Sequence, residues 1–201
     1  MEQYKKLILP GKDVSIHMDK PVFTEKTLES TPIWAGKVVK LRRDTVELVN
    51  GGTSFREVVA HAGGVVILPV DGEGRAWLVR QYRYPVEREL LEIPAGKLEP
   101  GEEPEAGARR ELKEETGLTA GRLISFGYEY PSPGFCDEKL WLYLALDLEQ
   151  GEACPDEDEF LAVECLPLEE LTERALRGEL PDGKSLALLF LAREYLQREK
   201  K

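Results

Sequence analysis

The chain has 201 residues, of which 42% are hydrophobic and 32% charged, a composition typical of one folded domain or of one domain with a small appendage. The formal net charge of −11 argues against a general nucleic-acid binder, which needs a basic surface, but it allows an anionic substrate that carboxylates bind through divalent cations. The longest apolar runs are too short to span a bilayer, and the first residues lack the apolar core of a signal peptide, so we expect a cytoplasmic protein.

The first predicted elements form a small β-rich piece, residues 1–60. Residues 38–49 alternate in a strand-like way, Asn50-Gly51-Gly52 provides a turn, and the strand pattern resumes at 54–60. We expect the main domain to cover 61–201, with strands at 63–70, 76–82, 122–130, 140–148 and 161–166 and helices at 104–116, 168–177 and 183–197. Interleaved strands and helices predict an α/β fold in which a mixed sheet lies between helices.

The predicted helix 104–116 has an unusual charge pattern at its C-terminal end. Its initial proline and Gly117 after its last turn are ordinary boundary residues. Glu111, Glu114 and Glu115 share one face and repel each other, and the last two lie where the helix dipole disfavours anions. Such local violations tend to mark functional sites, and a divalent cation would relieve the repulsion. The ordinary alternative is a solvated acidic helix whose glutamates pair with nearby basic side chains.

The longer stretch 96–118 decides between these alternatives. It has the spacing G-x5-E-x7-R-E-L-x-E-E-x-G-L and resembles the Nudix box of the Nudix hydrolases at every defined position. These positions are Gly96, Glu102, Arg110, Glu111, Leu112, Glu114, Glu115, Gly117 and Leu118. The resemblance implies the Nudix fold and a hydrolase that cleaves the pyrophosphate of a nucleoside diphosphate linked to another group.

The resemblance also implies a role for each of these positions. Glu111 and Glu115 would be the main Mg²⁺ ligands, Glu114 would share a metal ion or its water, and the carbonyl of Ala95 would complete the shell. Mn²⁺ is a candidate substitute for Mg²⁺. Arg110 would orient the glutamates, and Glu102 would help to anchor the unit of loop and helix. Gly96 and Gly117 would permit the backbone turns. The bound cations would neutralise the pyrophosphate, and a base near the attacking water would complete the site.

Two loops bear on the substrate and the base. Pro133, about 15 residues beyond the box, resembles a mark of the ADP-ribose pyrophosphatase subfamily, which implies hydrolysis of ADP-ribose to AMP and ribose 5-phosphate. The acidic run 156–160 resembles the loop that carries the catalytic glutamate in that subfamily. Glu157 is the first candidate for the base and Glu159 the second, with Glu114 a third acidic side chain at the reaction centre.

Similar enzymes place an N-terminal β domain across a homodimer, where aromatic and arginine side chains help to bind the substrate. This resemblance makes Arg56, Arg83 and Trp34 candidate substrate contacts, since guanidinium groups suit phosphate. For Trp34, a buried core or interface position is the simpler interpretation.

Several alternatives remain at this point. A Nudix enzyme for another compound, such as GDP-mannose, would share the whole box, and a non-catalytic nucleotide sensor would usually lack some of its glutamates. The stretch 178–185 formally matches a P-loop, GELPDGKS, but it follows a helix, and its acidic and proline residues oppose phosphate binding. Cys136, Cys154 and Cys165 form no CxxC pair, and we expect free thiols.

Overall fold

The computed structural model describes residues 23–154 and 160–199. The strands are β1 (Lys26–Ala35), β2 (Val39–Glu47), β3 (Thr53–His61), β4 (Gly64–Pro69), β5 (Arg75–Arg83), β6 (Arg88–Glu92), β7 (Ala95–Lys97), β8 (Leu118–Glu129), β9 (Leu140–Gln150) and β10 (Leu161–Pro167). The helices are η2 (Tyr84–Val86), α1 (Pro104–Thr116), α2 (Leu168–Leu176) and α3 (Gly183–Glu199). None of the described helices is both long and apolar enough to cross a bilayer.

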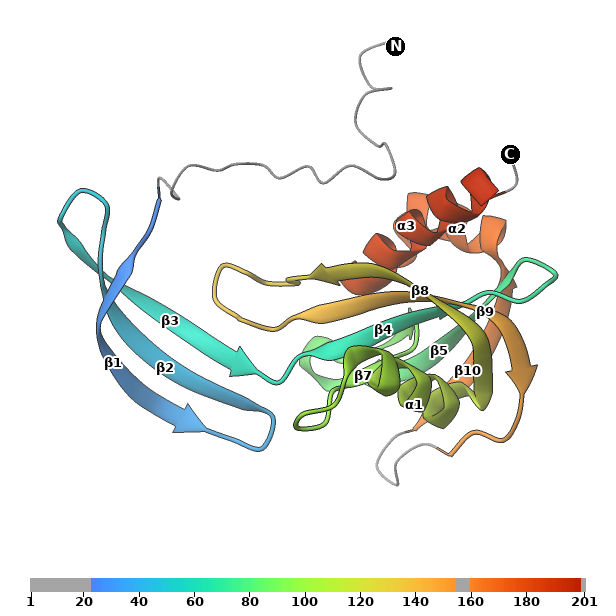
Figure 1. The fold of residues 1–201 in the computed structure, drawn as a ribbon, viewed down its shortest axis with the longest axis horizontal. Helices are drawn as coiled ribbons and strands as arrows, with labels where there is room; N and C mark the ends of the chain where they lie inside the picture. The colour runs from blue at the N-terminus through green and yellow to red at the C-terminus, as the bar shows by residue number, and fades with distance from the viewer. Residues whose placement is uncertain (1–22, 155–159, 200–201) are drawn as a thin grey trace, which may run out of the picture.

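The main body contains two sheets. One has the order β7-β4-β9-β8, in which β4 and β9 are parallel and the other pairs antiparallel; the second has the order β10-β5-β6. Helix α1 covers one side of this body, and α2 and α3 cover the other (Figure 1). This arrangement confirms the expected α/β fold with a mixed sheet between helices.

Strand β4 explains how the body is held together. All six of its residues are buried, as expected for a short, continuous apolar strand with helices on both faces. Val66 and Leu68 pack in one core cluster with Leu189 of α3, whereas Ile67 belongs to a second cluster with Leu112 of α1. Each such fully buried side chain contributes about 1.5–3 kcal/mol. The alternation along β4 therefore fixes α1 and α3 on opposite faces of one sheet.

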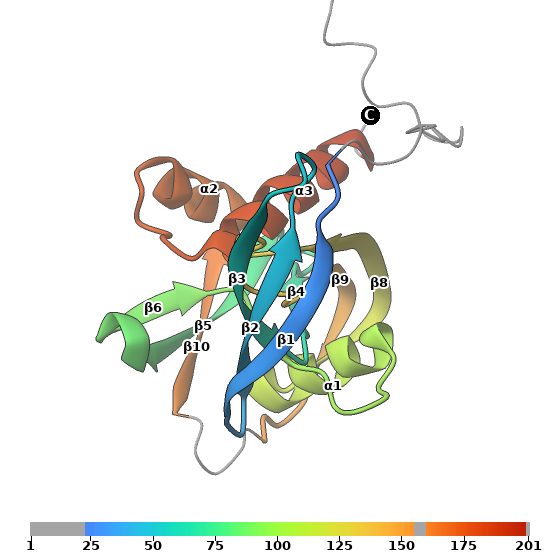
Figure 2. The same cartoon turned by 90° about the vertical axis from the view of Figure 1, so that its left-hand side faces the viewer.

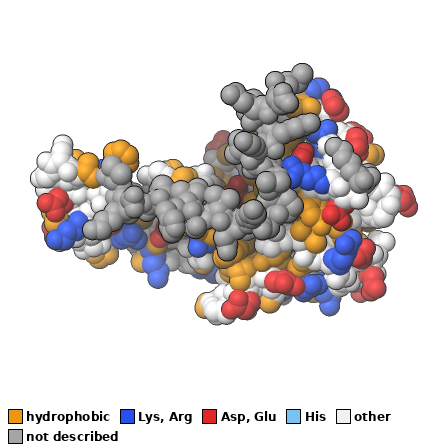
Figure 3. All heavy atoms as spheres, turned by 45° about the horizontal axis from the view of Figure 1, so that its top comes forward, with side chains coloured by type: hydrophobic (Ala, Val, Ile, Leu, Met, Phe, Trp, Pro, Cys, Tyr) orange, Lys and Arg blue, Asp and Glu red, His pale blue; other side chains and the backbone are white. Residues whose placement is uncertain are grey.

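The N-terminal piece forms its own antiparallel sheet, β1-β2-β3, which projects from the main body (Figures 1, 2 and 3). The expected turn is present, because the amide of Leu48 donates to the carbonyl of Gly52 at 2.8 Å and the amide of Gly52 donates to Asn50 Oδ1 at 3.0 Å. Strand β1 was not expected from the sequence. It is an edge strand that contains Pro32 and many exposed positions, so it lacks the alternation that marks a half-buried strand.

The loop after β8 lies against the N-terminal sheet. The amide of Val59 in β3 donates to the carbonyl of Phe135 at 2.8 Å, and the amide of Asp137 donates to the carbonyl of Val59 at 3.1 Å. The amide of His61 also donates to Asp137 Oδ1 at 2.9 Å. These bonds connect the Pro133 loop to the end of β3, where the chain enters the main body.

Candidate functional site

Helix α1 has the boundaries that the sequence predicts. Pro104 occupies its first turn, and Gly117 follows its last residue with φ of 72°, a left-handed conformation that favours glycine. A Cβ on Gly117 would lie 2.7 Å from the carbonyl oxygen of Gly151, so the close approach of the strand end also requires glycine. The helix therefore ends abruptly, and β8 begins at the next residue.

Two glutamates of α1 lie against the backbone of Ala95 and Gly96. Glu115 Oε2 accepts a hydrogen bond from the amide of Ala95 at 3.0 Å. A Cβ on Gly96 would lie only 1.9 Å from the carboxyl carbon of Glu111, so this carboxylate occupies the space that any other residue would fill. Glu111 is 8% exposed and Glu115 is 3% exposed. The helix and the β7 segment thus bring two buried carboxylates to one dipeptide.

Arg110 connects the remaining acidic residues of the motif. Its Nη1 donates to Glu111 Oε1 and to Glu114 Oε2, both at 2.8 Å, and its Nε donates to Glu102 Oε1 at 2.9 Å. Its Nη2 donates to the carbonyl of Lys97 at 3.0 Å. Hydrogen bonds from Arg110 lower the pKa of Glu102 to about 2. Part of the repulsion inferred from the sequence is therefore offset by an arginine of the same helix.

The donor set suits a divalent cation. Within residues 23–154 and 160–199, no three or more His, Cys, Asp or Glu side chains are gathered into a metal-binding group. The site instead offers two carboxylates, from Glu111 and Glu115, next to the Ala95–Gly96 backbone. A small cation such as Mg²⁺ prefers oxygen ligands and keeps several waters, so few protein ligands suffice. The residues present fit the ion that the resemblance implies.

A second polar cluster adjoins these glutamates. Arg83 donates from Nε and Nη2 to the two carboxylate oxygens of Glu92, each at 2.7 Å, and Lys184 Nζ donates to Glu92 Oε2 at 2.5 Å. Glu92 is 1% exposed. Burial opposes its ionisation, but the hydrogen bonds of Arg83 and the charge of Lys184 lower the pKa of Glu92. Glu92 lies three residues before Ala95, whose amide donates to Glu115 Oε2, so the backbone directly connects the two clusters.

The other expected site residues lie elsewhere or outside the description. Arg56 is in β3 and forms a bidentate ion pair with Glu25, and Pro133 is exposed in the loop after β8. Trp34 is 57% exposed in β1, so the interpretation of a side chain buried in this chain's own core is wrong. Its ring lies against Gly36, where a Cβ would meet the ring at 2.0 Å. The expected bases, Glu157 and Glu159, lie outside the described residues.

Two residues of the second cluster were not expected from the sequence. Glu92 interrupts the apolar run Leu90-Leu91-Glu92-Ile93, and a lone charge in such a run is a usable signal of a buried ion pair. The sequence Gly183-Lys184-Ser185 is part of the formal P-loop and resembles a stretch of ADP-ribose pyrophosphatases, but neither observation predicts a partner for Lys184. The rejection of that P-loop agrees with the structure, because Lys184 Nζ and Ser185 Oγ donate to Asp182 Oδ2 at 2.8 and 2.5 Å rather than surrounding an anion site.

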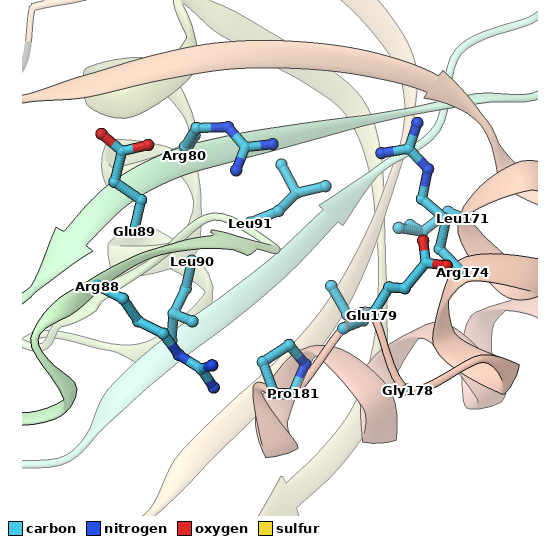
Figure 4. A pocket seen from close by; sticks show the side chains of 11 residues that line it. Arg80, Arg88, Glu89, Leu90, Leu91, Leu171, Arg174, Gly178, Glu179 and Pro181 are labelled. Atoms are coloured by element: carbon cyan, nitrogen blue, oxygen red, sulfur yellow. The ribbon is translucent and has the colours of Figure 1, made fainter.

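A separate pocket of about 390 Å³ lies between β6, α2 and the loop that precedes α3 (Figure 4). Arginines contribute to its wall, but two of them are already paired. Arg80 Nε lies 2.5 Å from Glu164 Oε1, and Arg174 Nη2 lies 2.5 Å from Glu170 Oε1. None of its lining residues belongs to the 96–118 motif, so the pocket is separate from the site on α1.

The chain is similar to several known proteins. An ADP-ribose pyrophosphatase of Bacillus subtilis is 46% identical over 182 residues, covering 88% of this chain and 97% of that protein. A methanol dehydrogenase activator of Bacillus methanolicus is 44% identical over 181 residues, covering 88% and 94%. A crystal structure of an ADP compounds hydrolase has the same fold, with a TM-score of 0.78 at 24% identity over 88% of this chain and 96% of that one. The NUDIX domain model matches residues 60–189, which include the whole 96–118 motif, and the chain therefore belongs to the NUDIX domain family.

Proposed function

We propose that this protein hydrolyses the pyrophosphate bond of ADP-ribose, in a reaction that depends on Mg²⁺, to give AMP and ribose 5-phosphate. The observation that carries the proposal is the pair of buried carboxylates, Glu111 and Glu115, packed against Ala95 and Gly96. The high identity to an ADP-ribose pyrophosphatase over nearly its whole length supports this choice of substrate, as does Pro133 at its expected place.

The candidate residues have separate roles in metal binding and substrate binding. Glu111 and Glu115, with the Ala95 carbonyl, would hold the divalent cation, and Mn²⁺ could substitute for Mg²⁺. When bound, the cation supplies Lewis-acid stabilisation of charge on the pyrophosphate and lowers the pKa of a bound water. Arg110 keeps Glu111 and Glu114 oriented through its two hydrogen bonds. Arg83, already aligned by Glu92, is the candidate donor to a substrate phosphate.

The proposed base is Glu157, with Glu159 as the second candidate. Both residues lie outside the described part of the chain, but their described neighbours support the assignment. The amide of Cys154 donates to the carbonyl of Glu114 in α1 at 3.0 Å, and Leu161 pairs with Gln81 in β5. Of the variants Glu157→Gln and Glu159→Gln, the one that removes the base should lower kcat by about 100-fold, the lower end for general base catalysis, and keep Mn²⁺ affinity.

We also propose that the protein is a homodimer in the cytoplasm. The projecting sheet exposes large apolar side chains, among them Ile33 at 54%, Trp34 at 57% and Phe55 at 65%. Small sheets need a packed apolar face for stability in water, and a partner that covers exposed large apolar side chains would provide one. A second copy would cover this face and could accept Arg56 and Trp34 as substrate contacts. The three free cysteines suit a reducing compartment.

The deciding experiment is turnover of a panel of nucleoside diphosphate compounds with Mg²⁺, followed by phosphate release from the products with an added phosphatase. The panel should contain ADP-ribose, GDP-mannose and a dinucleoside polyphosphate. We expect ADP-ribose to have the highest kcat/KM. The panel is needed because a methanol dehydrogenase activator is nearly as similar in sequence as the ADP-ribose pyrophosphatase. A tenfold higher kcat/KM for another compound would overturn the choice of ADP-ribose. No turnover of any compound would overturn the hydrolase proposal.

A further inference from the structure

The first turn of α3 contacts the segment that leads to the metal-binding residues. Lys184 Nζ bridges Glu92 Oε2 at 2.5 Å and Asp182 Oδ2 at 2.8 Å. One residue further, Ser185 Oγ accepts a hydrogen bond from the amide of Ile93 at 2.8 Å and donates to Asp182 Oδ2 at 2.5 Å. The exposed fraction of the Lys184 side chain is 13%, and Ser185 is fully buried. The start of the last helix is therefore bonded to the segment 92–93.

This segment leads directly to the site on α1. Two residues after Ile93, the amide of Ala95 donates to Glu115 Oε2, and the next residue is Gly96, against which Glu111 packs. Glu92 also accepts hydrogen bonds from both Nε and Nη2 of Arg83. The cluster thus joins α3 to both the proposed metal ligands and the proposed phosphate contact, although the first residue of α3, Gly183, is 68 positions after Glu115.

We infer that Lys184 is a positioning residue that acts through Glu92 on Arg83. The inference rests on the proposed pyrophosphatase function, because it assigns Arg83 to the substrate's diphosphate. Lys184 compensates part of the negative charge of the buried Glu92, so the positive charge of Arg83 can still attract the substrate's diphosphate. The bidentate pair with Glu92 keeps the guanidinium plane of Arg83 aligned. Asp182 holds Lys184 in place from the other side.

The charge balance explains why a lysine is needed here. Arg83 and Lys184 supply two positive charges, and Glu92 and Asp182 supply two negative ones. Without Lys184 the cluster carries one excess negative charge beside Glu115, and Arg83 becomes the only cation bonded to a carboxylate that is 1% exposed. Both changes oppose the binding of a diphosphate at Arg83. A loss of Lys184 should therefore raise KM, which a simple loss of folded protein would not do.

The test compares single and double variants of the full chain with ADP-ribose and Mg²⁺. Lys184→Met removes the charge at similar length, and Lys184→Arg restores it. Arg198→Met is the matched control, since it removes one positive charge from the other end of the same helix, where Arg198 pairs only with Glu194 among the described contacts. Lys184→Gln is a second variant that removes the charge but keeps a hydrogen-bond donor, for use if Lys184→Met does not fold. Mn²⁺ binding is followed by electron paramagnetic resonance.

We expect Lys184→Met to lower kcat/KM by about 10- to 100-fold with a clear rise in KM, as for a displaced binding group, while Mn²⁺ affinity stays within about threefold. Lys184→Arg should recover most of the loss, and Lys184→Gln should raise KM in the same direction as Lys184→Met. In an Arg83→Met background, Lys184→Met should add less than about threefold, because the two residues act in series.

Two results would overturn the inference and leave the proposed function intact. One is a Lys184→Met enzyme with the KM and kcat of Arg198→Met; if Lys184→Met does not fold, a Lys184→Gln enzyme with wild-type KM counts equally. The other is full additivity of Lys184→Met and Arg83→Met. In contrast, a wild-type enzyme that cleaves no nucleoside diphosphate compound would overturn the proposed function itself.

Discussion

The substitution Gly96→Ala tests the geometry of the site most directly. The added Cβ would lie 1.9 Å from Cδ of Glu111 and 2.0 Å from its Oε2, whereas ordinary van der Waals contact begins at 3.4 Å. The carboxylate must therefore move by about 1.5 Å. The colliding atoms are at the end of a flexible side chain, so Glu111 can swing aside without displacement of β7 or α1.

Because only the end of the Glu111 side chain moves, the substitution should reduce activity much more than stability. We expect the free energy of unfolding to fall by only about 1 kcal/mol, the lower end of the cost of overpacking. A reacting group misplaced by about 1 Å can cost about 100-fold in rate, so kcat should fall by at least about 100-fold. Mn²⁺ affinity should fall by at least about tenfold, since one of two buried carboxylates leaves the site.

The measurements are steady-state kinetics with ADP-ribose and Mg²⁺, Mn²⁺ titration by electron paramagnetic resonance, and urea unfolding. Gly72→Ala is the matched control, because a Cβ on Gly72 meets no atom within 4 Å. It should behave as wild type in all three assays. The reasoning would be refuted if Gly96→Ala kept both the kcat and the Mn²⁺ affinity of the Gly72→Ala protein.

Three further predictions concern single side chains. Glu115→Gln should retain the fold and lower kcat by at least about 100-fold, and steady-state kinetics within a few-fold of wild type would contradict the metal assignment. Hydrogen bonds from Arg110 hold the pKa of Glu102 at about 2 against an ordinary 4.5, so Glu102 contributes stability above pH 4.5 that is lost as the pH falls toward 2. The urea midpoint of unfolding should differ less between about pH 5 and about pH 3 in Glu102→Gln than in wild type. An equal difference in the two proteins would count against the pair of Glu102 and Arg110. Light scattering at micromolar concentration should give a dimer for wild type and a monomer for Trp34→Glu, whereas a monomeric wild type would exclude a shared site.

The sequence predicts those parts of the fold that local patterns specify. Helix α1 begins at Pro104 and ends before Gly117 as expected, because proline and glycine act within one turn. The apolar run in β4 and the turn at Gly51 were also recognisable. Strands β6 and β7 were missed, since they are short and gain their regularity from pairing with β5 and β4 rather than from their own pattern.

The site was predictable only as far as the motif extends. The spacing from Gly96 to Gly117 indicates which side chains share a helix face and where glycine is needed. It contains no information on Glu92 or Lys184, whose ion pair joins residues 92 positions apart. Such contacts depend on how α3 packs across the sheet. The exposure of Trp34 could not be predicted either, because it depends on what covers the N-terminal sheet.

The close approach of Glu111 to Gly96 is stronger evidence for a metal site than the charge pattern of the helix. Repulsion among Glu111, Glu114 and Glu115 first suggested a cation, but Arg110 already bonds Glu111 and Glu114 and could hold an ordinary acidic helix together. Arg110 does not explain why the Glu111 carboxylate occupies the space where a side chain at position 96 would lie. It also does not explain why Glu115 accepts a hydrogen bond from the amide of Ala95. Both features bring oxygen atoms to one backbone segment. A structural salt bridge needs neither of them, whereas a small cation that binds oxygen ligands needs such oxygen atoms close together.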